Sequence, residues 1–584
     1  MPQTRQPISR NLELEALRQA VQWPNPSPRT VLALAGQLLV ARQHDQGRAL
    51  FTELAEHVPD QPLYVALAGF FQALTGRDLD HALGLLDRAV ARAPGVTNYF
   101  RGLLLAQLPA QLGKAETAVA DLELVLALPD RPPAPAGQRF PVGLRRAIYP
   151  ALAAAYAALG RTADAQAARR RAGPAPADPD FPTLTTDWWM SRDDGFHLVP
   201  PRLVELAPRV HVAQGFDFAD VTAVQTGEGI VLVDTTTSRA HLGAALAELR
   251  TVTGTTAPIT HVILTHAHTD HIGGLDEVRA PGIEVIAQAN FPDELRLQHA
   301  SPPVLSRRSD PSGTGRRLDV VPDRLVRVPE KLTIGGVDFH LYPIAGGETR
   351  DGLVVHLPDR GVAIVGDMLA PQLGAPFLPE GSAEGLFDAM TLVEGLAPRV
   401  VIHGHAPLTE TFTIEVFPAL AAALRDLHQL TLDAIRHGVP LADILARNHL
   451  PAGLRDHPAA VLPYLVMRDN LIKRVHHQRT GYWKADGEGI EVVTAAEWAA
   501  ALDLLGGQTP HAFASAGEDL LDRGDLALAL RLTEYGLLRH PDDETLQGLR
   551  RRVLYRLLER SQQLSPFKFA IYAATARVEV PPAP

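Results

Sequence analysis

The pattern of hydrophobic and polar positions divides the chain into three stretches. From Arg29 to about Gly173, apolar residues recur at helical spacing in Ala- and Leu-rich runs. A proline-rich segment from Ala172 to Pro182 is typical of a linker, and after it the pattern changes to short β-branched runs. From Ile414 to the end the pattern is helical again. The sequence therefore predicts a strand-containing domain between two helical regions.

The first helical stretch carries a repeat. Its turns HVPD, RAPG and ALPD place Pro59, Pro94 and Pro129 at intervals of 35 residues. This interval is similar to that of tetratricopeptide-type helix pairs, which bury their faces by stacking on their neighbours. An Ala-rich helical bundle without repeats is the alternative. A similar turn pattern returns in the C-terminal stretch, at Gly524 and Pro541.

Short runs in the middle stretch predict strands, and several alternate between apolar and polar residues. They are VHVAQ, VTAVQTG, GIVLVDT, HVILTH, EVIAQ, RLVRV, KLTIGGVDFHLYPI, LVVHLP, GVAIVGD and RVVIHGH. Helical patterns lie between them, notably from Arg239 to Arg250 and from Glu384 to Leu396. Mixed strands and helices indicate a layered α/β domain whose sheets are covered on both faces.

Composition and charge narrow the functional classes. The 584 residues contain 55 Lys and Arg against 66 Asp and Glu, a net charge of -11, which argues against a nucleic-acid binder and favours a small or apolar partner. There is no cysteine, so any metal must be held by His, Asp and Glu. The N-terminus lacks the apolar core of a signal peptide, and no apolar run is long enough to span a bilayer. We therefore expect a cytoplasmic protein without a membrane span.

Candidate chemistry concentrates in LTHAHTDHIGG, which begins at Leu264 directly after the strand-like run HVI. Active sites of layered α/β folds collect where strands leave the sheet. Residues two apart in an extended segment point the same way, so His266 and His268 can face one point. Asp270 and His271 turn with the chain toward a neighbouring point. The arrangement suits two metal ions side by side, and ligands without sulfur favour Zn²⁺, with Fe or Mn as alternatives.

These residues form the pattern HxHxDH, through which the sequence resembles the metallo-β-lactamase superfamily. Other motifs of that superfamily follow in order. Asp234 in IVLVDTTTS matches its early aspartate, Asp367 in AIVGDML its bridging aspartate, and His405 in IHGHAP its last histidine. The resemblance implies a multidomain chain with a central αββα metallo-β-lactamase fold, flanked by all-α regions.

One departure points to a branch of the superfamily. Where most members have a histidine ligand, the turn AGGETRDG places Glu348, which is similar to the type III alkyl sulfatases. The segments GFDFADVTAV, LSRR and KLTIGGVDFHLYPI resemble further stretches of that family. LRDLHQLTLDAIRHGVPLADI is similar to the helix that opens its dimerisation domain, and GYWKADG resembles a later motif. The resemblance covers roughly residues 194–573.

On this resemblance we predict three domains. They are a tetratricopeptide-like helical domain over residues 1–180, a catalytic domain over 181–410, and a helical alkyl-sulfatase-type dimerisation domain over 411–584. The last of these implies a homodimer. The N-terminal repeats either recruit a protein partner or help to build the dimer.

The resemblance also implies a ligand set for two zinc ions. It consists of His266, His268 and Glu348 for one ion, Asp270, His271 and His405 for the second, and Asp367 as the bridge between them. Two adjacent cations lower the pKa of a water held between them and polarise an anionic substrate, which favours hydrolysis. Asp270 is either also a catalytic proton acceptor or a structural ligand only.

Substrate-binding candidates lie outside the ligand set. Arg307 and Arg308 suit bidentate binding of a sulfate or phosphate, and a solvated loop is the alternative. His428 aligns with a helix histidine of the alkyl sulfatases and either lines the pocket or lies on the helix surface. His403 lies two residues before the last ligand and either supports the ligands or, in another register, is the ligand itself.

Three departures from the alkyl sulfatases bear on function. The region after the bridging acid reads GDMLAPQLGAP and lacks the family's asparagine and histidines, one of which is thought to protonate the leaving sulfate oxygen. The sequence shows no counterpart of the family's sterol-carrier-like C-terminal domain. Helical repeats stand in place of its usual secretory start, which favours an intracellular role.

The leading hypothesis is a binuclear zinc hydrolase of alkyl sulfate or related sulfate esters, which acts through a metal-bound water or hydroxide on a small anionic molecule with an apolar part. The enzyme alternative is a metallo-hydrolase of another ester, a thioester, a lactone or a phosphodiester, favoured by the missing histidines. A third hypothesis, from another class, is a helical-repeat scaffold with an inactive metal domain. The natural substrate stays open at this point.

Overall fold

The computed structural model describes residues 11–129, 142–172, 184–191, 194–300, 318–369, 381–481, 492–503 and 509–580. Its contacts divide the chain into two compact units, each assembled from separate parts of the sequence. Unit 1 consists of Met1–Asp187, Glu491–Gln563 and Ala583–Pro584, and unit 2 of Trp188–Ile490 and Leu564–Pro582. The expected multidomain architecture is confirmed. The predicted boundaries of three domains stay a prediction, and the helices of residues 411–584 divide between the two units.

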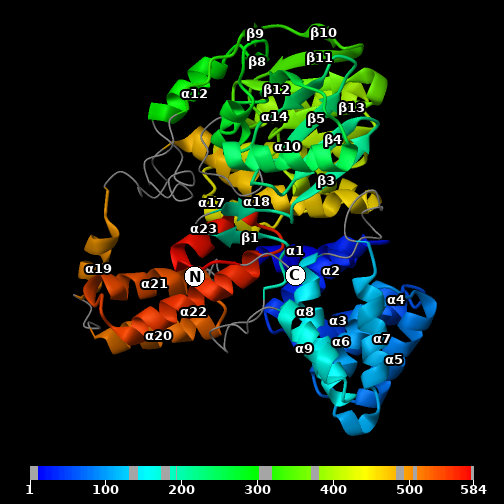
Figure 1. Ribbon diagram of the computed structural model, residues 1–584. Coiled ribbons are helices and arrows are strands. Elements are labelled where there is room, and N and C mark those ends of the chain that lie inside the picture. Colours follow the sequence, from blue (N-terminus) through cyan, green and yellow to red (C-terminus); the bar gives the residue numbers. More distant parts are fainter. Residues whose placement is uncertain are drawn as a thin grey trace. The chain divides into compact units, whose positions relative to one another are not determined.

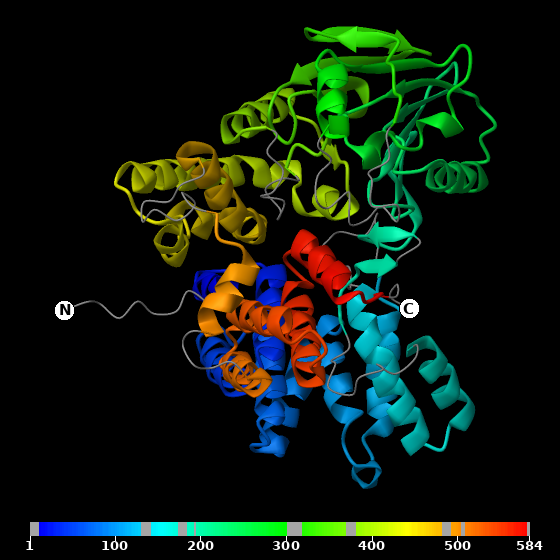
Figure 2. The ribbon, with the colours of Figure 1, turned by 90° about the vertical axis from the view of Figure 1, so that its left-hand side faces the viewer.

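Every secondary-structure element described in unit 1 is a helix, and its N-terminal helices are blue to cyan in Figure 2. The N-terminal helices are α1 (Leu12–Val21), α2 (Pro28–Val40), α3 (His44–His57), α4 (Pro62–Leu74), α5 (Leu79–Arg92), α6 (Val96–Leu105), α7 (Ala115–Leu126), α8 (Arg145–Ala158) and α9 (Thr162–Ala172), with short 3₁₀ turns η1 (Ala110–Leu112) and η3 (Val142–Leu144). The C-terminal helices are α19 (Ala495–Asp503), α20 (Pro510–Asp522), α21 (Leu526–Arg539) and α22 (Glu544–Ser561). The predicted turns HVPD and RAPG separate α3 from α4 and α5 from α6, whereas the tetratricopeptide likeness stays a prediction.

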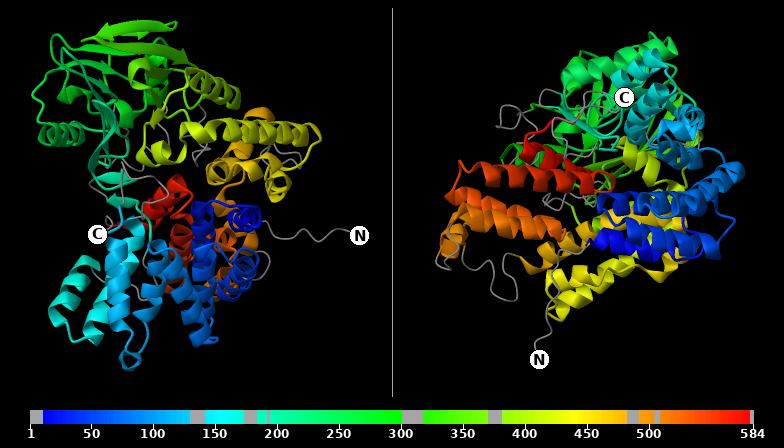
Figure 3. Two further views of the ribbon diagram at one scale, coloured as in Figure 1. Left: turned by 90° about the vertical axis from the view of Figure 1, so that its right-hand side faces the viewer. Right: turned by 90° about the horizontal axis from the view of Figure 1, so that it is seen from below.

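Neighbouring helices of unit 1 pack closely. Gly69 of α4 meets α5, where a Cβ at this glycine would lie 2.7 Å from the carbonyl oxygen of Ala82. Phe51 of α3 stacks on Phe71 of α4 with 5.4 Å between ring centroids. Helices α20 to α22 lie side by side, as the orange and red helices of Figure 3 show. The repeat-like helices therefore bury their faces against sequence neighbours, as stacked helix pairs do.

Unit 2 contains two large β-sheets and one small one. The seven-stranded sheet runs in the order β3 (Arg202–Ala207), β4 (Val210–Gln214), β5 (Val221–Gln225), β6 (Ile230–Val233), β7 (Ile259–Ile263), β8 (Glu284–Gln288) and β9 (Arg324–Val326). The five-stranded sheet runs in the order β10 (Glu330–Ile334), β11 (Val337–Ile344), β12 (Gly352–Leu357), β13 (Val362–Gly366) and β14 (Val400–His403). The small sheet pairs β1 (Trp189–Ser191) with β2 (Gly195–His197).

Unit 2 also contains helices, of which α10 packs on the seven-stranded sheet and α15 on the five-stranded sheet. They are α10 (Arg239–Thr253), α11 (Thr269–Ile272), α12 (Phe291–Ala300), α14 (Ala383–Leu396), α15 (Ala406–Thr411), α16 (Phe417–Arg436), α17 (Leu441–Ala446), α18 (Pro458–Thr480) and α23 (Pro566–Ala576), with 3₁₀ turns η4 (Leu275–Glu277), η5 (Pro358–Arg360), η7 (Ile414–Val416) and η8 (Ala452–Asp456). No helix in the described part of the chain is long and apolar enough to cross a membrane.

Alternation along the strands explains why two sheets stack. On β6, Val231 and Val233 join the core between the two large sheets, while Ile230 and Leu232 join a second core that includes leucines of α10. Successive side chains of a strand point to opposite faces, so an all-apolar run such as IVLV must be covered on both sides. Figure 1 shows α10 on the outer side of the seven-stranded sheet. The predicted αββα layering is confirmed.

The direction of the strands brings the ligand candidates to one edge of the sheets. Strands β6 to β9 pair in parallel, and so do β13 and β14. The carboxyl ends of neighbouring parallel strands meet at the same edge of a sheet, which is where α/β folds place their sites. Asp234 follows β6, His266 follows β7, Asp367 follows β13 and His405 follows β14.

The last described helix belongs to unit 2. On α23, Phe569 meets Trp188 edge-on at 5.5 Å between ring centroids. The chain then pairs with β1, because the backbone N–H groups of Met190 and Val580 each donate to the other's carbonyl oxygen at 2.9 Å. A segment that follows the unit 1 helices α19 to α22 in sequence therefore completes unit 2.

Candidate metal centre

The predicted histidine motif lies where β7 ends. His266 and His268 occupy the loop after the strand, and Asp270 and His271 lie in the four-residue helix α11. The expectation that residues two apart face one point holds, since His266 Nε2 lies 3.1 Å from His268 Nδ1. All three histidines of the motif are buried.

The first ligand group joins His266 and His268 to Glu348, which lies in the connection between β11 and β12. Its carboxylate Oε2 lies 3.1 Å from His266 Nε2 and 3.2 Å from His268 Nδ1. Glu348 is 5% exposed. The two sheets thus each supply part of this group.

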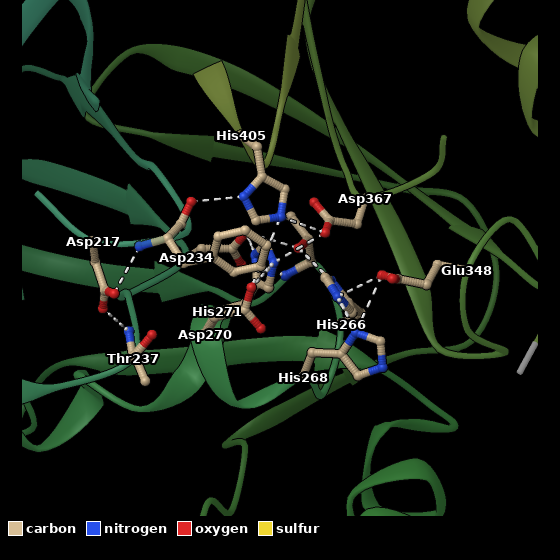
Figure 4. A network of polar contacts seen from close by, with 12 residues as sticks. Asp217, Asp234, Thr237, His266, His268, Asp270, His271, Glu348, Asp367 and His405 are labelled. Atoms are coloured by element: carbon tan, nitrogen blue, oxygen red, sulfur yellow. Dashed lines mark hydrogen bonds and ion pairs between the residues drawn. The ribbon is translucent and has the colours of Figure 1, made fainter. Parts of the chain in front are cut away.

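The second group joins Asp270, His271, Asp367 and His405 (Figure 4). Asp367 Oδ2 lies 2.7 Å from His405 Nε2 and 3.5 Å from His271 Nε2. Asp270 Oδ2 lies 3.4 Å from His271 Nε2 and 3.8 Å from His405 Nε2. Gly366 has φ +54°, in the left-handed region that favours glycine, at the point where the chain turns from β13 into Asp367.

The two groups adjoin each other. The ring of His266 lies 4.1 Å from that of His271, centroid to centroid. The contacts of Asp367 described above run to the second group, so its role as a bridge between two ions stays a prediction.

Hydrogen bonds fix the orientation of two ligand candidates. His271 Nδ1 donates to Asp234 Oδ2 at 2.8 Å, and His405 Nδ1 donates to the carbonyl oxygen of Phe218 at 2.7 Å. When Nδ1 of a histidine donates a proton, its Nε2 carries the free lone pair and can bind a metal. Asp234 is itself held by Thr265, whose N–H and hydroxyl both donate to it at 2.8 Å. These contacts point both Nε2 atoms at the shared centre.

The centre couples buried charges. Burial lowers the pKa of His405, but the charges of Asp367 and Asp270 outweigh it and raise that pKa to about 9. Against the opposing effect of burial, the charges of Asp270, Asp367 and Asp234 hold the pKa of His271 well above its usual value, and the charges of His405 and His271 hold the pKa of Asp367 well below its own. Imidazolium rings thus neutralise the carboxylates in the metal-free protein, and binding a cation must displace their protons.

The residues fit a pair of divalent cations. His271 Nε2 and Asp367 Oδ1 are buried and make no hydrogen bond among the described residues. Such orphaned polar atoms are costly unless something compensates them, and a cation bound to their lone pairs would do so. Nitrogen and carboxylate donors without sulfur are typical of zinc, and iron or manganese also accept them.

The structure separates the two histidines near the end of β14. His403 Nε2 lies 3.1 Å from the carbonyl oxygen of Phe412, and burial lowers the pKa of this imidazole to about 4. His403 therefore points away from the cluster as a neutral core histidine. His405, two residues on, takes the ligand position in the geometry, which favours the predicted register over the alternative.

Of the three substrate-binding candidates, the structure describes only His428. His428 of α16 lies 5.5 Å from the ring of Phe387 and 3.9 Å from a carboxylate oxygen of Glu384, and no contact among the described residues links it to the ligand candidates. Arg307 and Arg308 lie outside the described residues, as does most of the segment that follows Asp367.

Sequence reasoning did not assign a role to the groups that orient His405. Phe218 supplies a backbone carbonyl and Asp217, beside it, supplies a carboxylate that accepts from the N–H of Thr237 at 2.7 Å. Their only signal was the segment GFDFADVTAV, singled out as a resemblance without a role for its residues.

Comparison with known proteins places this geometry among relatives. The family model described as the metallo-beta-lactamase superfamily matches residues 214–405, which include all the ligand candidates. The probable metallo-hydrolase YqgX of Bacillus subtilis (strain 168) is 32% identical over 26% of this chain and 71% of its own. The hydroxyacylglutathione hydrolase of Erythrobacter litoralis (strain HTCC2594) is 27% identical over 30% of this chain and 60% of its own.

Longer matches carry the name alkylsulfatase. The (R)-specific secondary-alkylsulfatase of Pseudomonas sp is 22% identical over 59% of this chain, and this chain spans 58% of its length. The solved structure of the stereoselective inverting sec-alkylsulfatase Pisa1 from Pseudomonas sp. superposes with a TM-score of 0.54 at 18% identity, covering 65% of this chain and 66% of that one. At this identity the structural likeness concerns the fold, which extends beyond the sheets into the flanking helices.

Proposed function

Because the chain belongs to the metallo-β-lactamase superfamily, we propose that it is a binuclear zinc hydrolase of alkyl sulfate esters or related sulfate esters. One observation carries the proposal: a histidine pair with Glu348 adjoins a second group of two histidines and two aspartates, all at one edge of two stacked sheets. The relatives named alkylsulfatases, which match more than half of the chain, support the substrate class.

The chain's own residues divide the work. One cation would be held by the first ligand group, and the other by the second, with Asp367 shared between them. The cations, when bound, supply Lewis-acid activation of water and of the ester. Asp234 and the Phe218 carbonyl accept from Nδ1 of His271 and His405, so the Nε2 atoms point inward and the proton that a cation displaces from each ring is the one on Nε2.

Asp270 is the candidate proton acceptor. Its side chain is 21% exposed, the most open of the carboxylates in the two groups. Burial would raise its pKa, but the imidazolium charges of His271 and His405 hold that pKa below its usual value, so Asp270 is ionised at neutral pH. An ionised, partly exposed carboxylate oxygen can accept a proton from a neighbouring water.

The experiment combines metal content with product release. We expect two zinc ions per chain and sulfate release from octyl or decyl sulfate. Glu348→Gln keeps the shape of the side chain but removes its charge, and should lose one zinc equivalent and the activity. Glu205→Gln removes a charge from the exposed edge of β3 and is the matched control. Two zinc ions without sulfate release would keep the metal centre and reject the sulfatase.

A second candidate is hydrolysis of a thioester. It is supported by the relative named a hydroxyacylglutathione hydrolase, and by the sequence GDMLAPQLGAP, which lacks histidines after the shared aspartate. Release of free thiol from an acylglutathione, measured on the same zinc-loaded preparation, distinguishes the two. A chain that binds no zinc and hydrolyses neither substrate would support the helical scaffold instead. A homodimer, a protein partner for the repeats and a cytoplasmic location remain predictions beside this proposal.

A further inference from the structure

A second polar cluster lies in unit 2, outside the ligand groups. His241 of α10 places Nδ1 3.0 Å from Asp217 Oδ2 and Nε2 2.7 Å from Asp194 Oδ1. We call Asp194, His241 and Asp217 the His241 triad. The hydrogen bond and charge of Asp217, joined by those of Asp194, raise the pKa of His241 to about 9 against the opposing effect of burial. At neutral pH the triad is therefore an imidazolium between two carboxylates.

The triad is anchored to a loop that touches the metal centre. Asp217 lies in the connection between β4 and β5, and its Oδ2 also accepts from the N–H of Thr237 at 2.7 Å. The connection is thereby tied to the turn that leads from Asp234 into α10. Figure 4 shows Asp217 and Thr237 on one side of this connection and His405 on the other.

The next residue of the loop holds a ligand candidate. The carbonyl oxygen of Phe218 accepts from His405 Nδ1 at 2.7 Å, and the Phe218 ring lies 4.4 Å from the imidazole. Two residues later, the N–H of Asp220 donates to the carbonyl oxygen of Gly404 at 2.7 Å. The backbone of the loop thus hydrogen-bonds to His405 and to Gly404 before it. The side chain of Asp217 in turn fixes the loop to Thr237.

We propose that the His241 triad positions His405 for its metal ion through the carbonyl of Phe218. The inference rests on the two-ion centre of the proposed function. A histidine whose Nδ1 proton has a fixed acceptor presents Nε2 as an acceptor in one orientation, and groups that fix a ligand in this way strengthen metal binding. Asp194, His197 and His241 also lie close enough to one another to hold an ion, so a third zinc ion bound there is the outcome that would overturn a positioning role.

The expected effect is selective. Loss of a group that orients a metal-bound histidine weakens metal binding by about 10–100-fold. The triad acts one peptide unit away from that group, so we expect the low end, about tenfold. Only the ion held with His405 should be affected. The hydrogen bonds of the loop given above run to His405 and Gly404, neither of which belongs to the group of His266, His268 and Glu348.

The test uses the full chain and zinc alone. Zinc affinities of the two sites are measured by competition with a chromophoric chelator for the native protein, His241→Gln and Asp217→Asn. His261→Gln is the matched control, because His261 also pairs with one carboxylate, that of Glu284 at 3.5 Å, on a strand of the same sheet. Asp194→Asn, whose carboxylate is 46% exposed, is the milder variant if the others fold poorly.

The metal-free protein gives a second readout. Nitrogen-15 spectra of the imidazole rings report which nitrogen of His405 carries the proton, and they do so without any reaction. We expect the neutral ring of His405 to carry its proton on Nδ1 in the native protein, and to be a mixture of tautomers in His241→Gln and Asp217→Asn. The double variant should weaken zinc binding little more than either single one, since the residues act as a unit.

Several outcomes overturn the proposal. They are equal weakening of both zinc sites, an unchanged second site in variants that retain their melting temperature, or a third zinc ion that His241→Gln abolishes. Failure of the proposed function looks different, because a native protein that binds two zinc ions but hydrolyses no sulfate ester still allows both readouts.

Discussion

Among the residues that orient the ligands, Asp234 should show the largest loss of stability when it is replaced. Two different replacements separate the effect of its charge from the effect of its backbone conformation. Asp234 is 3% exposed and accepts three hydrogen bonds at 2.8 Å, two from Thr265 and one from His271 Nδ1. Its φ of +64° lies in the left-handed region, where Asn is tolerated and Ala is strained. Asp234→Asn therefore tests the charge of the carboxylate alone. Asp234→Ala removes every side-chain acceptor and also strains the left-handed backbone conformation.

The magnitudes follow from the hydrogen bonds. In Asp234→Asn, the amide oxygen still accepts from the N–H of Thr265, and the Thr265 hydroxyl can turn to accept from the new NH₂ group. The Nδ1 proton of His271 then faces a donor, so one charge-assisted hydrogen bond is lost, worth about 1.5–3 kcal/mol. Asp234→Ala loses all three, at about 1 kcal/mol or more each, and adds about 1–2 kcal/mol of strain. We expect the free energy of unfolding of unit 2 to fall by about 2 kcal/mol in Asp234→Asn and by about 5 kcal/mol in Asp234→Ala.

The assay measures unfolding and metal binding separately. Urea unfolding of the metal-free chain, followed by amide exchange in β6 and β7, reports the stability of unit 2. Zinc competition reports the ligands, where loss of the Asp234 acceptor should weaken the ion held by His271 by about 10–100-fold. Equal costs for Asn and Ala would refute the backbone argument. Native zinc affinity in Asp234→Asn would refute the claim that this carboxylate orients His271.

Three further predictions follow from the geometry. Gly404→Ala should abolish binding of the second ion and destabilise unit 2 by about 1–3 kcal/mol, as zinc content and urea unfolding would measure. The reason is that the new Cβ would lie 2.6 Å from Cε1 of His271 and would also meet the carboxylate of Asp367. Removal of zinc by a chelator should lower the melting temperature, since a ligand at 100 times its Kd contributes about 2.7 kcal/mol, and the variant Glu348→Gln should show a smaller shift. The pKa of His241 is raised to about 9 from 6.5, so its ion pairs stabilise the fold fully below pH 6.5 and are lost as the pH rises to 9 and above; unfolding of the metal-free native chain should show this loss and His241→Gln should not.

The strands and the ligands could be predicted because both leave a local signal. The runs IVLV and VVIH are apolar on both faces and became β6 and β14, and the glycine pair in KLTIGGVDFHLYPI became the turn between β10 and β11. The helix expected from Arg239 begins at that residue. Strand β3 was not predicted, because RLVELA carries Glu205 at its exposed edge and lies after two prolines.

The supporting contacts could not be predicted for physical reasons. A backbone carbonyl has no residue type, so nothing in the letters F-D-F marks the Phe218 oxygen as the acceptor for His405. Asp217 and His241 stand in a loop and a helix of ordinary composition, and their pairing exists only once the sheet brings the turn after Asp234 against the loop after β4. The side chain of His428 illustrates the reverse case, in which a position resembling a family residue makes no contact with the centre among the described residues.

The return of the chain to β1 has a consequence for biosynthesis. The backbone pairing of Met190 with Val580 and the packing of Trp188 on Phe569 join the first strand of unit 2 to a segment almost 400 residues later. While the ribosome is still making the intervening helices, this edge of the unit lacks its partner, and contacts of such long sequence separation form slowly. A nascent chain therefore carries exposed aromatic surface at this edge until Phe569 and Val580 have been made, and chaperones that bind apolar surface should recognise it in that interval.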